Sequence, residues 1–265
     1  MFTKLICFLC LISTLFGSYT EEFNQCFDIL KRKDWETVID LGEKALHEQE
    51  DPRVHARLAS CYFYLSRYDK MKEHIDLCLE QSLDADSEEL LIRSLYLLSA
   101  YYRSQEEYPE ARRVIAKALN KARRLGNKPL LSKVLFNAGA ADSDDPKGNL
   151  EYAKVCLEEG LTLIDPNTDD AHRMLIRLGR VYLLTKCTQA ASLIVSQLSQ
   201  ETLVPRTQVH FYTFAAKVAE AKNNHEELTK YLTLGINLAK QLKMQRDVER
   251  LESIKGENND HRQAS

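Results

Sequence analysis

The sequence contains few of the residues that interrupt helices. Only 9 Gly and 6 Pro are spread over 265 residues, and no run alternates apolar and polar residues over a useful strand length. Because Gly and Pro destabilise helix interiors and a half-buried strand needs a period of two, this composition favours helices throughout. The formal net charge is −3, so the chain as a whole lacks the positive charge that attracts nucleic acid.

Motifs of catalytic, phosphate-binding and metal-binding sites are also missing. We find no GxSxG, no phosphate-cradling Gly loop and no dinucleotide fingerprint. His172 and His210 have no His or Cys partner at i, i+4, which makes a zinc site on a helix unlikely in this sequence. An acidic loop that begins at Asp142 has Ala153 at its twelfth place, where a calcium loop needs Glu. We therefore predict no catalytic residues, no cofactor and no metal, and a protein that is not an enzyme.

Cysteine is sparse after the first 18 residues, and its pattern is not that of a disulfide framework. Five cysteines remain there, which is an odd number, and no two form a CxxC pair. They are Cys26, Cys61, Cys78, Cys156 and Cys187. Since buried cysteine packs as a small apolar residue, we interpret all five as reduced packing residues; a disulfide framework or a metal site is the alternative.

The only long apolar run lies at the start of the chain. Lys4 precedes about a dozen mainly apolar residues from Leu5 to Phe16, and Gly17 and Ser18 follow. This arrangement is typical of a secretory signal peptide, and the run is shorter than the ~20 residues of a membrane-spanning helix. We predict a signal peptide or anchor over residues 1–18, with a helix packed on the rest of the chain as a third possibility. A signal peptide implies export to a secreted, periplasmic or envelope-associated location; otherwise the protein is cytoplasmic or membrane-anchored, and it meets a membrane only through this segment.

A two-helix pattern recurs along the remaining chain. The starts of the second helices align at Trp35, Tyr68, Tyr108, Leu150, Thr188 and His225, which are 33, 40, 42, 38 and 37 residues apart. Small residues recur where the helices are expected to touch, as at Ala59, Ser99, Gly179 and Ala216 on first helices and at Ala45, Cys78, Ala118, Gly160 and Gly235 on second helices. Two helices approach to about 8 Å only where side chains are small. Each pair would leave an apolar face open, so stacking of pairs is needed to complete the core.

This pattern resembles the tetratricopeptide repeat over about residues 20 to 240. The strongest match is Leu178-Gly179 followed by Tyr182 and by Ala191 in the next helix. The resemblance implies an all-α fold, an α-α superhelix (TPR-like solenoid) of about six helix pairs plus a C-terminal capping helix. We predict the solenoid over 19–240, the capping helix over 241–254 and a disordered tail over 255–265. The first helix of the fourth repeat is expected to be cut short or loosened by residues 140–148.

The resemblance also implies that the first helices line a concave groove. Twenty residues at the second, sixth, ninth and thirteenth places of five repeats would face it; eight are Lys or Arg and none is Asp or Glu. This excess predicts a basic groove for an acidic segment, in which arginines can bind carboxylates in pairs. The alternative is that these arginines satisfy neighbouring acids and helix ends. The predicted groove residues are Arg53, Arg57, Tyr64, Arg93, Arg173, Arg177, Arg180, His210, Phe214 and Lys217.

These observations predict a protein–protein interaction module, an adaptor or scaffold that holds a peptide or an acidic segment of another protein. Two alternatives remain open at this point: a regulator or sensor that responds to a ligand or peptide, and a structural scaffold that associates with itself. We expect no nucleic-acid partner, because the chain carries a net negative charge.

Overall fold

The computed structural model describes residues 20, 23, 27, 35–84 and 87–263, with side chains described for all of these except 83, 84 and 256–263. The predicted leader, residues 1–18, lies outside the described residues. Every regular element in the described part is a helix, which confirms the all-α prediction. The chain divides into two compact units, Met1–Gly126 and Asn127–Ser265. Among the described residues, no helix combines the length and apolarity that a membrane span requires.

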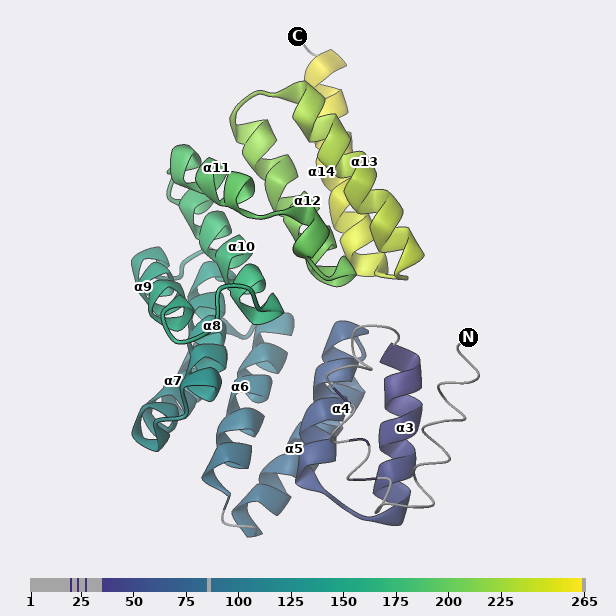
Figure 1. Ribbon diagram of the computed structural model, residues 1–265, viewed down its shortest axis with the longest axis vertical. Helices are drawn as coiled ribbons and strands as arrows, with labels where there is room; N and C mark the ends of the chain where they lie inside the picture. Colours follow the sequence, from purple (N-terminus) through teal and green to yellow (C-terminus); the bar gives the residue numbers. More distant parts are fainter. Residues whose placement is uncertain (1–19, 21–22, 24–26, 28–34, 85–86, 264–265) are drawn as a thin grey trace. The chain divides into compact units, whose positions relative to one another are not determined.

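Unit 1 consists of helices that pack as consecutive antiparallel neighbours (Figure 1). Its described helices are α3 (Trp35–Glu48), α4 (Pro52–Tyr64), α5 (Tyr68–Asp84), α6 (Glu88–Ser104) and α7 (Tyr108–Leu125). The α4–α5 contact has a core of fully buried side chains that includes Leu58, Met71 and Ile75. Helix α4 begins at Pro52, after Asp51 caps it by accepting the backbone N–H of Arg53.

Unit 2 repeats the same construction and ends on a single helix. Its elements are α8 (Lys128–Ser143), α9 (Leu150–Leu161), α10 (Asp169–Leu184), α11 (Thr188–Gln197), the 3-10 helix η1 (Gln200–Thr202), α12 (Pro205–Ala221), α13 (His225–Gln241) and α14 (Gln245–Gln263). Helix α8 pairs with α9, α10 with α11 and α12 with α13, and α14 packs on α13 (Figure 1). The core includes Met174, Phe211, Phe214 and Leu251, all of them at most 1% exposed.

The predicted starts of the six second helices are confirmed at every position. Helices α3, α5, α7, α9, α11 and α13 begin at Trp35, Tyr68, Tyr108, Leu150, Thr188 and His225. The small residues predicted at helix contacts are buried wherever they are described. At Gly179 on α10, a Cβ atom would lie 2.2 Å from the Phe214 ring. Small side chains therefore let neighbouring helices approach closely, as the repeat pattern indicated.

The turn between the two helices of a pair also repeats. Ser66, Glu106, Lys186 and Asn223 adopt left-handed backbone conformations, with φ between 54° and 62°. After each of them the next N–H bonds a carbonyl five residues back, for example Cys187 N to Tyr182 O at 2.7 Å. This is the geometry of a helix C-cap that usually employs Gly. The fold therefore imposes the same strained turn on four residues that are not Gly.

Three predictions differ from the structure. Helix α8 is not cut short, because it runs to Ser143. Helix α14 runs to Gln263, so the tail predicted to be disordered from residue 255 is helical up to that point. Cys187 is exposed at the start of α11, not packed, whereas Cys61, Cys78 and Cys156 are buried as predicted. Cys26 lies outside the described residues.

Candidate partner-binding surface

Two of the predicted groove arginines in unit 1 are paired with carboxylates close to them in sequence. The Arg53 guanidinium donates to both oxygens of Asp51, with Nη2 2.7 Å from Oδ2 and Nε 3.1 Å from Oδ1. The Nη2 atom of Arg93 donates to Glu89 Oε1 at 2.6 Å. These acids compensate the charge of both arginines locally, which is the alternative that the sequence left open.

The two other predicted residues in unit 1 pack against aromatic rings. The guanidinium of Arg57 lies 5.2 Å from the centroid of the Phe27 ring, and Tyr64 stacks on Trp35 with the centroids 4.7 Å apart. Both side chains are half-buried. Unit 1 therefore engages all four predicted groove residues in contacts within the unit.

In unit 2, the contacts of Arg177 hold two helices together. Its Nη1 atom donates to Asp144 Oδ1 at 2.7 Å and to Ser143 Oγ at 3.1 Å, and its side chain is only 14% exposed. Its guanidinium also lies 5.3 Å from the centroid of the Phe136 ring. Arg177 thus ties α10 to the end of α8, and its substitution is expected to affect stability first.

The neighbouring arginines on α10 are placed differently. Arg173 lies over the same Phe136 ring, at 5.5 Å from the centroid. Arg180 is 3.7 Å from Asp144, which is beyond hydrogen-bond distance, and its side chain is 35% exposed. Arg173 and Arg180 therefore lie on the same side of α10 as Arg177.

His210 on α12 lies where positive charges converge from three helices. Burial holds the pKa of this imidazole well below its usual range, and the positive charges of Arg206, Arg173, Arg250 and Arg180 lower it further. Arg206 lies one turn before His210 on α12, and α10, which carries Arg173 and Arg180, packs on α12. Arg250 lies one turn after Asp247 on α14, and Asp247 Oδ1 is 3.7 Å from His210 Nδ1. We call Arg173, Arg180, Arg206, His210 and Arg250 the basic cluster.

The basic cluster is desolvated but still accessible. The His210 side chain is 32% exposed, although burial of the imidazole is the main cause of its low pKa. Asp247 on α14 is the acid nearest to it, with Oδ1 3.7 Å from His210 Nδ1, and it is 17% exposed. Burial raises the pKa of Asp247 although the charges of Arg206 and Arg250 oppose this. The four strongest charge effects on His210 are nevertheless all positive.

The structure brings together only part of the predicted groove. Arg173, Arg180 and His210 meet in the basic cluster, and Lys217 is exposed on α12. Phe214 was assigned to the groove wrongly, because it is 1% exposed and lies in the core against Gly179.

Sequence reasoning missed two members of the cluster, Arg206 and Arg250. Arg206 precedes His210 by four residues and so shares its face of α12, which is a signal that the sequence offered. Arg250 lies on α14, which the sequence presented only as a capping helix. Its proximity to His210 is a tertiary feature that no local spacing indicates.

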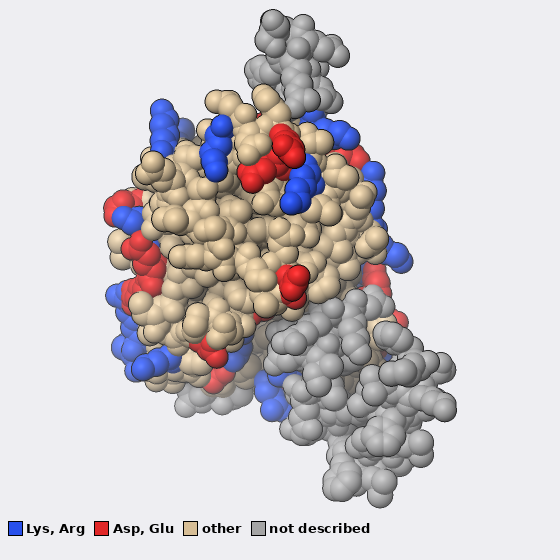
Figure 2. All heavy atoms as spheres, turned by 45° about the horizontal axis from the view of Figure 1, so that its top comes forward, with Lys and Arg blue, Asp and Glu red and all other residues tan. Residues whose placement is uncertain are grey.

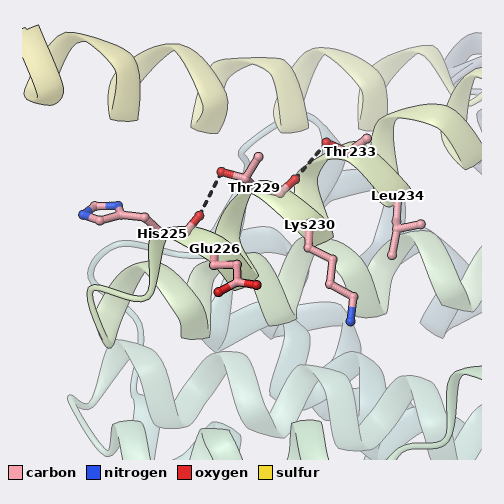
Figure 3. A pocket seen from close by; sticks show the side chains of 6 residues that line it. All are labelled: His225, Glu226, Thr229, Lys230, Thr233 and Leu234. Atoms are coloured by element: carbon pink, nitrogen blue, oxygen red, sulfur yellow. Dashed lines mark hydrogen bonds between the residues drawn. The ribbon is translucent and has the colours of Figure 1, made fainter.

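Other surfaces of the described chain offer less chemistry. A shallow depression on α13 is lined by six residues of that helix alone: His225, Glu226, Thr229, Lys230, Thr233 and Leu234 (Figure 3). The hydroxyls of Thr229 and Thr233 donate to carbonyl oxygens of their own helix at 2.8 Å. Figure 2 shows a face on which uncharged residues predominate, and α11 contains no Lys, Arg, Asp or Glu. Neither feature gathers polar groups from several helices, as the basic cluster does.

Comparison with known proteins identifies the fold. No protein-family model and no curated protein matches the chain. A Rap protein complexed with competence and sporulation factor is 13% identical, with a TM-score of 0.67, and the match covers 94% of this chain and 79% of that one. NprR in complex with its cognate peptide NprX is 15% identical, with a TM-score of 0.63 and coverage of 84% and 71%.

A third similar structure is PilW, a type IV pilus biogenesis factor. It is 17% identical, with a TM-score of 0.55, and the match covers 88% of this chain and 98% of that one. At such low identity, the similarity concerns the arrangement of helices and not the residues of any site. The chain therefore has a tetratricopeptide-like helical-repeat fold, as its sequence pattern predicted.

Proposed function

We propose that this protein is a binding module that recognises an acidic segment of another protein or peptide through the basic cluster of unit 2. The observation that carries the proposal is that α10, α12 and α14, which pack together here and are joined by the 3.7 Å contact between His210 and Asp247, carry arginines whose positive charges act on His210. Guanidinium groups match carboxylates in geometry and charge, and their hydrogen bonds to carboxylates are stronger than those between neutral groups. Helices fix the spacing of these donors, so that little ordering is needed when a ligand binds.

Two of the structurally similar proteins support a peptide or protein partner. NprR is seen with its cognate peptide, and the Rap protein is seen with competence and sporulation factor. The acidic character of the partner is inferred from this chain alone. Several positive charges on one accessible surface attract a ligand that carries carboxylates.

The test is direct binding of synthetic peptides to the purified full-length chain. One panel contains fluorescein-labelled peptides rich in Asp and Glu, and a matched panel has Asn and Gln in their place. We expect the acidic peptides to bind at least about tenfold more tightly than their amide counterparts. We also expect this preference to shrink as NaCl rises from about 50 to about 500 mM, because salt screens charges at an accessible site.

The variants separate the basic cluster from general charge. Arg173→Glu combined with Arg250→Glu reverses two charges of the cluster, and we expect it to abolish most of the preference for acidic peptides. Lys222→Glu combined with Lys230→Glu reverses the same number of charges at exposed positions outside the cluster and should preserve the preference. Arg177 is kept intact, because losing its ion pair would confuse stability with binding. Equal binding of the two panels, or equal losses in both variants, would exclude the proposal.

A further inference from the structure

Unit 1 contains a buried pair of histidines that the proposed peptide binding does not involve. His55 on α4 is 2% exposed and His74 on α5 is 5% exposed. Their Nδ1 atoms lie 2.8 Å apart, which is a hydrogen-bond distance. Neither nitrogen faces solvent, so the pair is a direct polar contact within the core of the α4–α5 packing.

A carboxylate stands at each outer end of this pair. His55 Nε2 lies 2.8 Å from Glu50 Oε2, and His74 Nε2 lies 3.5 Å from Glu43 Oε1. The Tyr62 hydroxyl donates to the same Glu43 oxygen at 3.0 Å, and the Tyr62 ring stacks on His74 with the centroids 5.3 Å apart. The result is a continuous row of titratable groups that runs from Glu50 to Tyr62 through the two imidazoles.

The geometry fixes where the protons of the pair can lie. The hydrogen bond with His55 lowers the pKa of Glu50, so this carboxylate is ionised at neutral pH and can only accept. His55 must therefore donate from Nε2. A neutral His55 then has a bare Nδ1, and His74 donates to it from its own Nδ1. One further proton fits on His74 Nε2, facing Glu43.

The two rings can thus hold three protons on their four nitrogens. A fourth proton has no satisfactory place in the pair. It would have to occupy His55 Nδ1, where it would face the N–H of His74 at the 2.8 Å contact. The hydrogen bond would be lost, and two imidazolium ions would be buried side by side. Each imidazolium would have a carboxylate at its outer end, but the two positive charges would face each other across the 2.8 Å contact, so the α4–α5 packing must loosen for this proton to bind.

We propose that the His55–His74 pair is a proton-sensitive latch, which holds α4 on α5 at neutral pH and releases this contact in mildly acidic solution. The direction follows from the charges around the pair. Burial lowers the pKa of His74, and the charge of His55 lowers it further, while Glu43 and Glu73 oppose the shift. Glu73 is itself bonded to Lys70 at 2.8 Å, so it does not reverse the effect.

The sign of the pH dependence can be stated. Histidines in the unfolded chain take up protons near pH 6.5, while burial lowers the pKa of His74 in the folded chain and the 2.8 Å contact leaves no place for a fourth proton on the pair. Below that pH the unfolded or locally opened state binds more protons, so the stability of the α4–α5 contact falls as the pH falls. For each proton excluded from the folded pair, the equilibrium constant for closing falls by up to about tenfold per pH unit.

Hydrogen exchange on the full-length chain tests the latch. Amide protection factors, corrected for intrinsic exchange rates, are compared at about pH 7.5 and about pH 5.5 for α4 and α5, with α8 and α9 of unit 2, which contain no histidine, as an internal reference. We expect protection of α4 and α5 to fall about tenfold relative to the reference in acid, because one excluded proton with an unfolded pKa near 6.5 gives a change of about this size between these two pH values. An unchanged ratio would overturn the proposal.

Two variants isolate the pair. In His74→Asn the side-chain amide can present either its NH2 or its oxygen to His55, so we expect the acid-induced loss of protection to disappear. His47→Asn changes an exposed histidine of α3 in the same unit and should keep the loss. An equal acid effect in His74→Asn and in the parent chain would show that other groups cause it.

A measurement on the unaltered protein covers the case in which His74→Asn does not fold. Long-range ¹H–¹⁵N spectra of the imidazole rings report the protonation of each ring nitrogen during a pH titration. We expect that both rings become imidazolium only as the protection of α4 and α5 is lost. Two imidazolium rings within a fully protected α4–α5 pair would overturn the proposal.

Discussion

Substitution of Gly179 by Ala tests how closely the helices of unit 2 are packed. A Cβ atom at this position would lie 2.2 Å from Cζ and 2.7 Å from Cε2 of Phe214. Carbon atoms in contact are normally about 3.5–4.0 Å apart, so the ring would have to retreat by more than about 1 Å. Because Phe214 is 1% exposed, the ring can move only by displacing other core side chains.

The size of the effect follows from two opposing contributions. Inserting a methyl group into a well-packed core costs about 1–3 kcal/mol, and the upper end applies here because the obstacle is a rigid, enclosed ring. The higher helix propensity of Ala offsets about 1 kcal/mol of this cost. We therefore expect Gly179→Ala to lower the free energy of unfolding by about 2 kcal/mol, as measured by urea denaturation followed by circular dichroism.

Two further variants make this prediction refutable. At Gly160 a new methyl group would meet Met174 Sδ at 2.8 Å, but a thioether chain can adapt, so Gly160→Ala should be nearly neutral. Phe214→Leu should partly relieve the clash, and its combination with Gly179→Ala should be less destabilised than the sum of the single changes by about 1 kcal/mol or more. Full stability of Gly179→Ala, or strict additivity in the double variant, would refute the reasoning.

Other predictions concern turns, an ion pair and a thiol. Lys186→Gly should raise the free energy of unfolding by about 1 kcal/mol, because Lys186 has φ 61°, a left-handed conformation that Gly adopts without strain. Asn223→Gly should raise the free energy of unfolding by less, since Asn tolerates this conformation. Asp144→Asn should lower the free energy of unfolding by about 1–2 kcal/mol, because it removes the carboxylate partner of a largely buried arginine; urea denaturation checks all three. In the native protein a thiol reagent should label Cys187 and spare Cys156, as mass spectrometry of peptides would show.

The sequence predicts the helix pairs well, because the physical requirement behind them is local and repeated. A close helix contact needs a small residue at a fixed place, and this need recurs in every pair. The departure at α8 depends on the turn that follows this helix. Asp142 looked like a solvated loop residue, yet it is 5% exposed and accepts the N–H of Asn149 at 3.0 Å. Gly148 permits this turn, since a Cβ there would lie 2.0 Å from the Asp142 carbonyl oxygen.

The candidate binding surface is only partly predictable, because assigning one stripe per helix assumes that each helix buries a single side. Helix α12 does not obey this assumption. All six residues from Phe211 to Ala216 are buried, so Phe214 belongs to the core although its place in the repeat suggested a groove. The same stripe selected Arg173, Arg180 and His210, whose side chains are half-buried, and their role in binding stays a prediction.

The contrast between the units shows why a count of basic residues does not identify a binding surface. In unit 1 the acids that compensate Arg53 and Arg93 lie two and four residues away, so any fold that keeps these helices keeps the pairs. In unit 2 the arginines whose charges act on His210 come from three helices, and no spacing along the chain relates Arg250 on α14 to the residues on α10 and α12. Stacking of the helix pairs brings these charges together, at the cost of their mutual repulsion. A surface that depends on the fold in this way can attract an acidic partner only when unit 2 is folded, so loss of its packing should abolish binding even with every arginine in place.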